Sequence, residues 1–119
     1  MSVTFEAKTL VIDGLTIPMQ WPVLDAVEHG NKVFVLLDPD AYLLDADYKR
    51  IRRQGSPAIK NLLAFDRAGA KLWDAELPES ADYYYKISST SPLVANSFSS
   101  YRCQIDSSTG AILAREFLK

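Results

Sequence analysis

Turn-forming residues at short intervals are the feature that most restricts how this chain can fold. Asp13-Gly14 separates two apolar segments, and two later turns, at residues 66–69 and 106–110, each begin with Asp and end with Gly. Asp-Gly tolerates the positive φ of a tight hairpin turn, and an Asp side chain can bond the backbone two residues further on. We therefore predict antiparallel β hairpins along most of the chain.

The segments beside these turns have the composition of strands. Residues 33–37 are entirely apolar, which predicts a central strand buried on both faces. Further strands are predicted at residues 61–65, 71–76, 83–87, 93–95, 101–105 and 111–117. The expected fold is mainly β, with about 8–10 antiparallel strands in two propeller-blade-like sheets or a β-sandwich. The predicted core contains Val33, Val35, Leu63, Phe65, Trp73, Ile105 and Leu113.

Residues 38–60 interrupt the strand pattern. This charged stretch lacks the period-two alternation of a half-buried strand. Tyr48 and Ile51 lie at helical spacing, and Asp45 or Asp47 is suited to cap a helix. We predict one long insertion that holds one or two turns of helix.

Length, composition and charge indicate one domain spanning residues 1–119. A hydrophobic content of 48% is enough for one core, and a net charge of −2 argues against a nucleic-acid partner. The N-terminus lacks the basic and apolar regions of a secretion signal, and no apolar run is long enough to span a bilayer, so we expect no membrane association. A single cysteine fits a reducing compartment, and we expect a cytoplasmic location.

A strand-Asp-turn-Gly-strand unit occurs twice, in residues 61–73 and 101–114. A spacing of about forty residues is typical of β-propeller blades. Residues 65–73 and 105–110 resemble blades of quinoprotein-type propellers, and the whole layout resembles a set of small uncharacterised bacterial proteins, which implies a bacterial origin. Two blades cannot form the cofactor-binding ring of such propellers, so no cofactor is expected. The alternative interpretation is that both hairpins merely share their turn chemistry.

No catalytic or metal-binding motif is recognisable. The one histidine, His29, lies in a predicted turn, and Cys103 lies on the inward side of a predicted strand, where thiols are ordinarily inert. The aspartates of residues 38–47 do not follow the spacing of a calcium-binding loop. We expect no enzymatic activity, no catalytic residue and no metal site.

The candidate binding residues lie in the insertion and in the tyrosine triplet 83–85. Four aspartates precede a cationic run at residues 49–53, and exposed tyrosines are enriched at protein interfaces. The expected partner-binding residues are Asp38, Asp40, Asp45, Asp47, Tyr48, Arg50, Arg52, Arg53 and Tyr84.

These features predict a non-enzymatic protein-binding domain. One specific form of this function is neutralisation of a toxin by an immunity-type protein, with a basic toxin domain as the partner. The alternatives are a ligand-sensing module of unknown substrate and a propeller fragment that associates with its own copies through strand edges.

Overall fold

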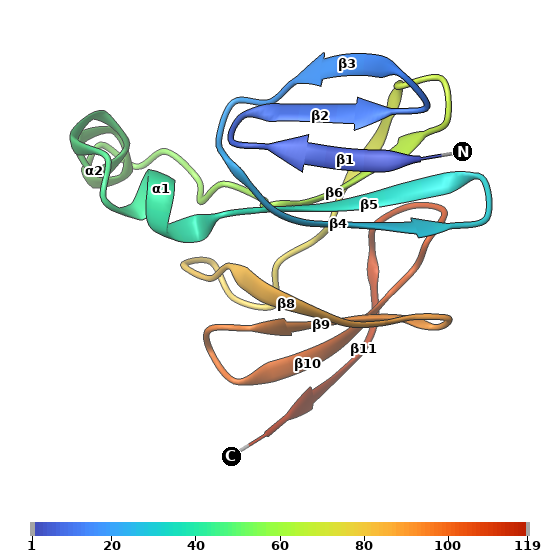
Figure 1. Ribbon diagram of the computed structural model, residues 1–119. Helices are drawn as coiled ribbons and strands as arrows, with labels where there is room; N and C mark the ends of the chain where they lie inside the picture. Colours follow the sequence, from blue (N-terminus) through green and yellow to red (C-terminus); the bar gives the residue numbers. More distant parts are fainter. Residues whose placement is uncertain (1, 119) are drawn as a thin grey trace.

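The computed structural model describes residues 2–118, which form eleven strands and two short helices (Figure 1). The strands make three antiparallel sheets. The first sheet contains β1 (Val3–Glu6), β2 (Thr9–Ile12) and β3 (Leu15–Pro18). The middle sheet contains β4 (Val23–His29), β5 (Lys32–Leu37), β6 (Leu62–Asp66) and β7 (Lys71–Asp74). The third sheet contains β8 (Tyr84–Thr90), β9 (Leu93–Ser97), β10 (Tyr101–Ile105) and β11 (Ile112–Phe117).

The prediction of a mainly β fold with antiparallel sheets is confirmed. The sequence pattern did not predict strands β1 and β4. Each of them is an edge strand of its sheet. Most side chains of both strands are exposed or only half-buried. Strand β4 ends with the polar residues Glu28 and His29, whose side chains are exposed to solvent.

The middle sheet is buried on both faces because it lies between the other two sheets (Figure 1). On one face, Val33 and Val35 share a hydrophobic cluster with Leu10 of the first sheet. On the other face, Phe34 and Leu36 belong to a second cluster that includes the inner side chains of the third sheet. Residues 33–37 therefore form the central strand that their unbroken apolar sequence predicts.

The first predicted hairpin is confirmed. Strands β2 and β3 pair in register around Asp13 and Gly14, with Leu10 opposite Ile17. The φ angles of Asp13 and Gly14 are 49° and 87°, the two positive values that a type I′ hairpin turn requires.

The two Asp-Gly units form equivalent turns, one between β6 and β7 and the other between β10 and β11. A side-chain oxygen of Asp66 accepts hydrogen bonds from the amides of Ala68 and Ala70, both at 2.9 Å. The corresponding oxygen of Asp106 accepts one from the amide of Ser108 at 2.8 Å. In both sheets the unit connects the third and fourth strands of a consecutive meander.

The core prediction is correct for six residues and wrong for Leu113, which is 59% exposed. Strand β11 carries a bulge at this point, because Ile105 pairs with Ile112 while Gln104 pairs with Ala114. The extra residue, Leu113, has no partner across the strand pair, and Ile112 packs against the core in its place.

The insertion between β5 and β6 is ordered and contains two helices, α1 (Pro39–Leu43) and α2 (Ala46–Arg53). Each helix begins after an aspartate whose carboxylate accepts a backbone hydrogen bond, Asp38 from Asp40 N at 3.0 Å and Asp45 from Tyr48 N at 2.9 Å. Both helices lie beyond one end of the middle sheet (Figure 1). Within residues 2–118, neither helix has the length and apolar character needed to cross a membrane.

Candidate partner-binding cleft

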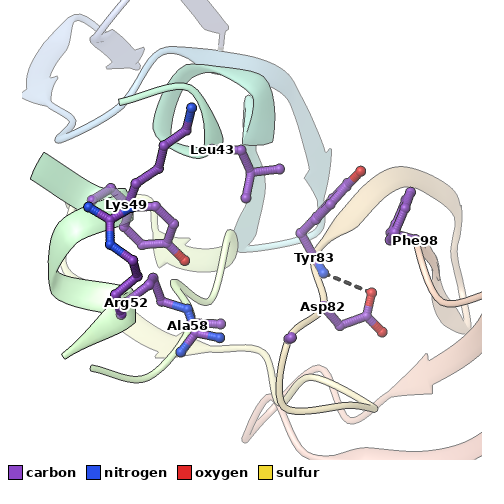
Figure 2. A pocket seen from close by; sticks show the side chains of 10 residues that line it. Leu43, Lys49, Arg52, Ala58, Asp82, Tyr83 and Phe98 are labelled. Carbon is purple, nitrogen blue, oxygen red and sulfur yellow. Dashed lines mark hydrogen bonds between the residues drawn. The ribbon is translucent and has the colours of Figure 1, made fainter. Parts of the chain in front are cut away.

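A cleft of about 490 Å³ lies between helix α2 and the start of the third sheet (Figure 2). Side chains of the insertion form one side of it, and the segment before β8 together with the turn between β9 and β10 forms the other. The lining residues are Leu43, Tyr48, Lys49, Arg52, Arg53, Ala58, Ala81, Asp82, Tyr83 and Phe98. Its volume falls in the range of ordinary ligand sites.

Helix α2 gives the cleft a cationic wall. Lys49, Arg52 and Arg53 are three and four residues apart, so they share one face of the helix. Among residues 2–118, none of the three has a carboxylate within 4.0 Å. The guanidinium of Arg52 instead donates to the carbonyl oxygen of Ser56, which fixes this side chain against the end of the helix.

The neighbouring Arg50 faces away from the cleft. Its guanidinium lies 3.6 Å from the carboxylate of Asp47, at the i,i+3 position on the same helix. Arg50 and Arg53 are both exposed arginines in the last turn of α2. Only Arg53 lines the cleft, and within the described residues 2–118 it has no carboxylate partner. The two residues are therefore a matched pair for testing the cleft.

Tyr48 packs α2 against the rest of the insertion. Its ring packs edge-on against Tyr42, with 5.2 Å between the ring centroids, and both rings are buried. The hydroxyl of Tyr48 accepts a hydrogen bond from the amide of Ile59 at 3.3 Å. These contacts seat α2 against its neighbours, so its cations are presented from a helix and not from an irregular loop.

An aromatic pair forms the opposite wall. The rings of Tyr83 and Phe98 stack with centroids 5.0 Å apart and planes inclined by 20°, and Phe98 is 65% exposed. The amide of Phe98 also donates to the carbonyl oxygen of Tyr83 at 2.9 Å. Partial burial raises the pKa of the Tyr83 hydroxyl, and the carboxylates of Asp40 and Asp82 raise it further, so this ring is neutral at physiological pH.

Asp82 holds the aromatic wall in place. It is only 3% exposed, and its carboxylate accepts hydrogen bonds from the amide of Tyr83 at 2.8 Å, from the amide of Ser99 at 3.1 Å and from the hydroxyl of Ser99. Figure 2 shows the bond to Tyr83, with Tyr83 and Phe98 on the side of the cleft opposite Lys49 and Arg52. Since its oxygens are already occupied by protein donors, Asp82 is a structural group of the cleft.

The predicted site residues separate into two groups. Arg52, Arg53 and Tyr48 line the cleft, whereas Asp38 and Asp45 are used as helix caps. Asp40 and Asp47 are exposed on the two helices, and Arg50 pairs with Asp47. Two of the four aspartates therefore cap the helices, and Arg52 and Arg53, unlike Arg50, face the cleft.

Tyr84 is the residue for which the expectation of an exposed aromatic surface is wrong. It is 0% exposed, its hydroxyl donates to the carbonyl oxygen of Glu76, and its amide donates to the side chain of Asn61 at 3.0 Å. Burial raises the pKa of the Tyr84 hydroxyl. The alternation of the triplet turns Tyr84 into the core, and Tyr85 is the tyrosine that is exposed.

Sequence reasoning missed the aromatic wall. Phe98 lies in a serine-rich turn, residues 97–100, where a large apolar side chain has no core to enter. A phenylalanine in such a turn is the sequence signal that could have indicated an exposed aromatic residue. Its pairing with Tyr83 depends on how the start of β8 lies against the turn after β9, which no local pattern shows.

Neither His29 nor Cys103, the side chains weighed as candidates for catalysis, lines this cleft. His29 is exposed at the end of β4, and Cys103 is buried on β10, where burial raises the pKa of its thiol. Within residues 2–118, no three His, Cys, Asp or Glu side chains are grouped so as to hold a metal ion.

Comparison with known proteins identifies a family and nothing finer. Neither a search of curated proteins nor a search of solved structures found a significant match. Residues 1–117 match the family described as "Domain of unknown function (DUF7957)". Because this match covers nearly the whole chain, the protein belongs to that family.

Proposed function

We propose that this protein is a non-catalytic binding domain that docks a protein partner at the cleft between α2 and the third sheet. The single observation that carries the proposal is that three cations, none with a carboxylate partner among residues 2–118, face the half-buried Tyr83 and the exposed Phe98 across one cleft. Arginine and aromatic side chains are the residues that most often dominate the energy of protein interfaces.

The two walls have the rigidity that binding requires. The cations lie on a capped helix anchored by Tyr48, and the aromatic pair is held by Asp82 and by the backbone hydrogen bond between Phe98 and Tyr83. Docking on groups that are already ordered loses less conformational entropy than docking on mobile loops. An exposed phenylalanine beside unpaired cations is therefore a suitable anchor for a partner.

Toxin neutralisation by an immunity-type protein is the specific form of this proposal, and it needs only a surface complementary to the toxin. The cleft supports it through its unpaired charges, which would steer a charged partner and set specificity. Its own test is whether the captured partner is toxic when expressed alone and harmless when expressed with this protein.

Affinity capture from the native host, followed by mass spectrometry, tests the binding function. We expect wild-type protein to retain one stoichiometric partner. The variant Lys49→Glu/Arg53→Glu should lose it, and the variant Arg50→Glu/Lys60→Glu, with the same change of net charge outside the cleft, should keep it. Equal retention by all three proteins would exclude the cleft as the docking site.

Self-association is a second candidate, favoured by the open edge of the third sheet. Strand β11 is the edge strand there, and most of its side chains are exposed, including Leu113 and Phe117. An open edge strand offers unpaired backbone groups to a second chain. The likeness to propeller blades belongs to this proposal and is supported by two consecutive four-stranded meanders with equivalent Asp-Gly turns. Sedimentation velocity tests it: a dimer that Leu113→Lys and Phe117→Lys dissociate would favour it, and a concentration-independent monomer would exclude it.

A further inference from the structure

We infer that the segment bound in the cleft is an extended, acidic segment of the protein partner, in which two carboxylates flank an aromatic or large apolar side chain. This inference rests on the proposed function and specifies the chemistry of the partner. It also reverses the sign of charge expected from the sequence, which pointed to a basic partner.

The reversal follows from where the carboxylates of the insertion are used. Asp38 and Asp45 accept backbone hydrogen bonds as helix caps, and Asp47 lies beside Arg50. Asp40 is exposed on α1 and does not line the cleft, although its carboxylate acts on the hydroxyl of Tyr83 on the aromatic wall. Of the charged side chains that line the cleft, three are cations and one is the carboxylate of Asp82, already occupied by three donors. The charge available to a ligand is therefore positive.

The spacing of the cations matches an extended chain. Lys49 and Arg53 are one helical turn apart, which places their attachment points about 6 Å apart along the axis of α2. Alternate residues of an extended strand point to the same side and lie about 6.8 Å apart. Two acidic side chains at positions i and i+2 of a bound segment can thus meet Lys49 and Arg53 together.

The same geometry indicates which kind of side chain lies between the two carboxylates of the bound segment. In an extended segment, position i+1 points away from positions i and i+2. When the carboxylates face α2, this side chain faces the opposite wall, where Phe98 is exposed beside Tyr83 (Figure 2). Aromatic pairs gain from offset or edge-to-face contact beyond the area they bury, so an acidic-aromatic-acidic pattern fits both walls at once.

A protein segment fits the charge balance of the whole domain better than a polyphosphate does. The chain carries a net charge of −2, so no broad positive field surrounds the cleft to attract a nucleic-acid backbone. The cations are confined to one face of α2, so they offer no extended track for a phosphate backbone. Inorganic phosphate remains a necessary comparison, since it competes for the same cations.

The experiment uses ¹⁵N-labelled full-length protein and four probes in parallel titrations followed by amide chemical shifts. Two are short capped peptides in Gly-Ser flanks, one with a Glu-Phe-Glu core and one with the same residues in the order Glu-Glu-Phe. The third replaces both Glu by Lys, and the fourth is inorganic phosphate.

We expect the Glu-Phe-Glu peptide to bind most tightly, with shifts confined to residues 48–53, 82–83 and 97–99. Arg53→Glu should weaken this binding by about fivefold or more, while Arg50→Glu leaves it unchanged within error. Phe98→Ala should weaken it as well, while Leu113→Ala, a control at an exposed apolar residue outside the cleft, should not.

Three outcomes would overturn the inference: tighter binding of the Lys-Phe-Lys peptide, equal binding of the two acidic peptides with no effect of Phe98→Ala, and phosphate shifts at the cleft that the peptide cannot displace. Failure of the proposed function is distinguishable from these. If wild-type protein retains no partner from the host, the docking role itself fails. If it retains one whose binding is weakened by Phe98→Ala but unchanged or strengthened by Arg53→Glu, the cleft still docks the partner and only the acidic-segment inference fails.

Discussion

The indole of Trp73 in β7 donates a hydrogen bond to the carbonyl oxygen of Ser107 at 3.0 Å, and its ring lies directly against Gly110 in the same turn. This contact joins the middle sheet to the third sheet through the second Asp-Gly unit. Trp73 also packs on Phe34, with ring centroids 5.9 Å apart, so one side chain connects the turn to the central strand.

Replacing Trp73 with Ala should lower the free energy of unfolding by about 3 to 5 kcal/mol, because it empties a buried site between two sheets and removes a hydrogen bond. Urea denaturation followed by circular dichroism measures the change. A loss below about 1 kcal/mol would mean that the two sheets do not depend on this contact.

Alanine substitutions at Gly110 and Gly30 distinguish two costs of adding a methyl group in a turn, which are backbone strain and steric clash with neighbouring atoms. Both have positive φ, 80° and 60°, but a Cβ on Gly110 would lie 2.7 Å from Cε3 of Trp73 and 2.8 Å from the carbonyl oxygen of Asp74, whereas one on Gly30 meets nothing within 4 Å. Gly30→Ala should therefore cost about 1 kcal/mol from backbone strain alone. Gly110→Ala should cost at least about 1 to 3 kcal/mol more, because backbone must move. Equal losses in thermal unfolding would contradict this packing.

Asp45 and Asp47, at the start of α2, form a second matched pair for substitution. Asp45→Ala removes the carboxylate that accepts from Tyr48 N and should lower stability by about 1 kcal/mol. Asp47→Ala removes only an exposed ion pair with Arg50, so the free energy of unfolding should stay the same within error. The helical signal near 222 nm and the melting temperature report both changes; a larger loss for Asp47 would show that the cap assignment is wrong.

From the buried hydroxyl of Tyr84 we predict how the free energy of unfolding changes at alkaline pH. Burial raises its pKa in the folded protein above the ordinary value of 10.0. Below pH 10 both states keep the proton, and as pH rises above 10 the unfolded state ionises first, so the free energy of unfolding falls. Tyr84→Phe should make that fall shallower by up to about 1.4 kcal/mol per pH unit. Urea denaturation between pH 9 and 12 measures the slopes; identical slopes for wild type and Tyr84→Phe would contradict the burial of this hydroxyl.

The fold was predictable where local chemistry decides the structure. Asp13-Gly14 allows few conformations other than a tight turn, and the apolar residues 33–37 have few places except a sheet interior. The positions of Leu113 and Tyr84 depend instead on a bulge and on which face of β8 meets the middle sheet. A shift of one residue in strand pairing moves a side chain to the opposite face of the sheet. The neighbouring sequence does not indicate whether such a shift occurs.

The candidate site was predictable only on its helical side. The cationic run at residues 49–53 marked the insertion, but the division between Arg53 in the cleft and Arg50 beside Asp47 depends on the rotation of α2. The facing wall joins Tyr83 and Phe98, which are fifteen residues apart in sequence, by the pairing of β8 with β9. Such contacts arise from tertiary packing, so only the folded structure shows that the two walls form one cleft.

Hydrogen–deuterium exchange of the protein alone and in complex with its captured partner tests the central claim most directly. The account predicts slower exchange of amides in α2, around Asp82 and Tyr83, and in the turn that carries Phe98, with the outer face of β10 and β11 unchanged. Protection confined to β10 and β11, with the amides around the cleft unchanged, would place the partner elsewhere and contradict the assignment of the cleft as the docking site.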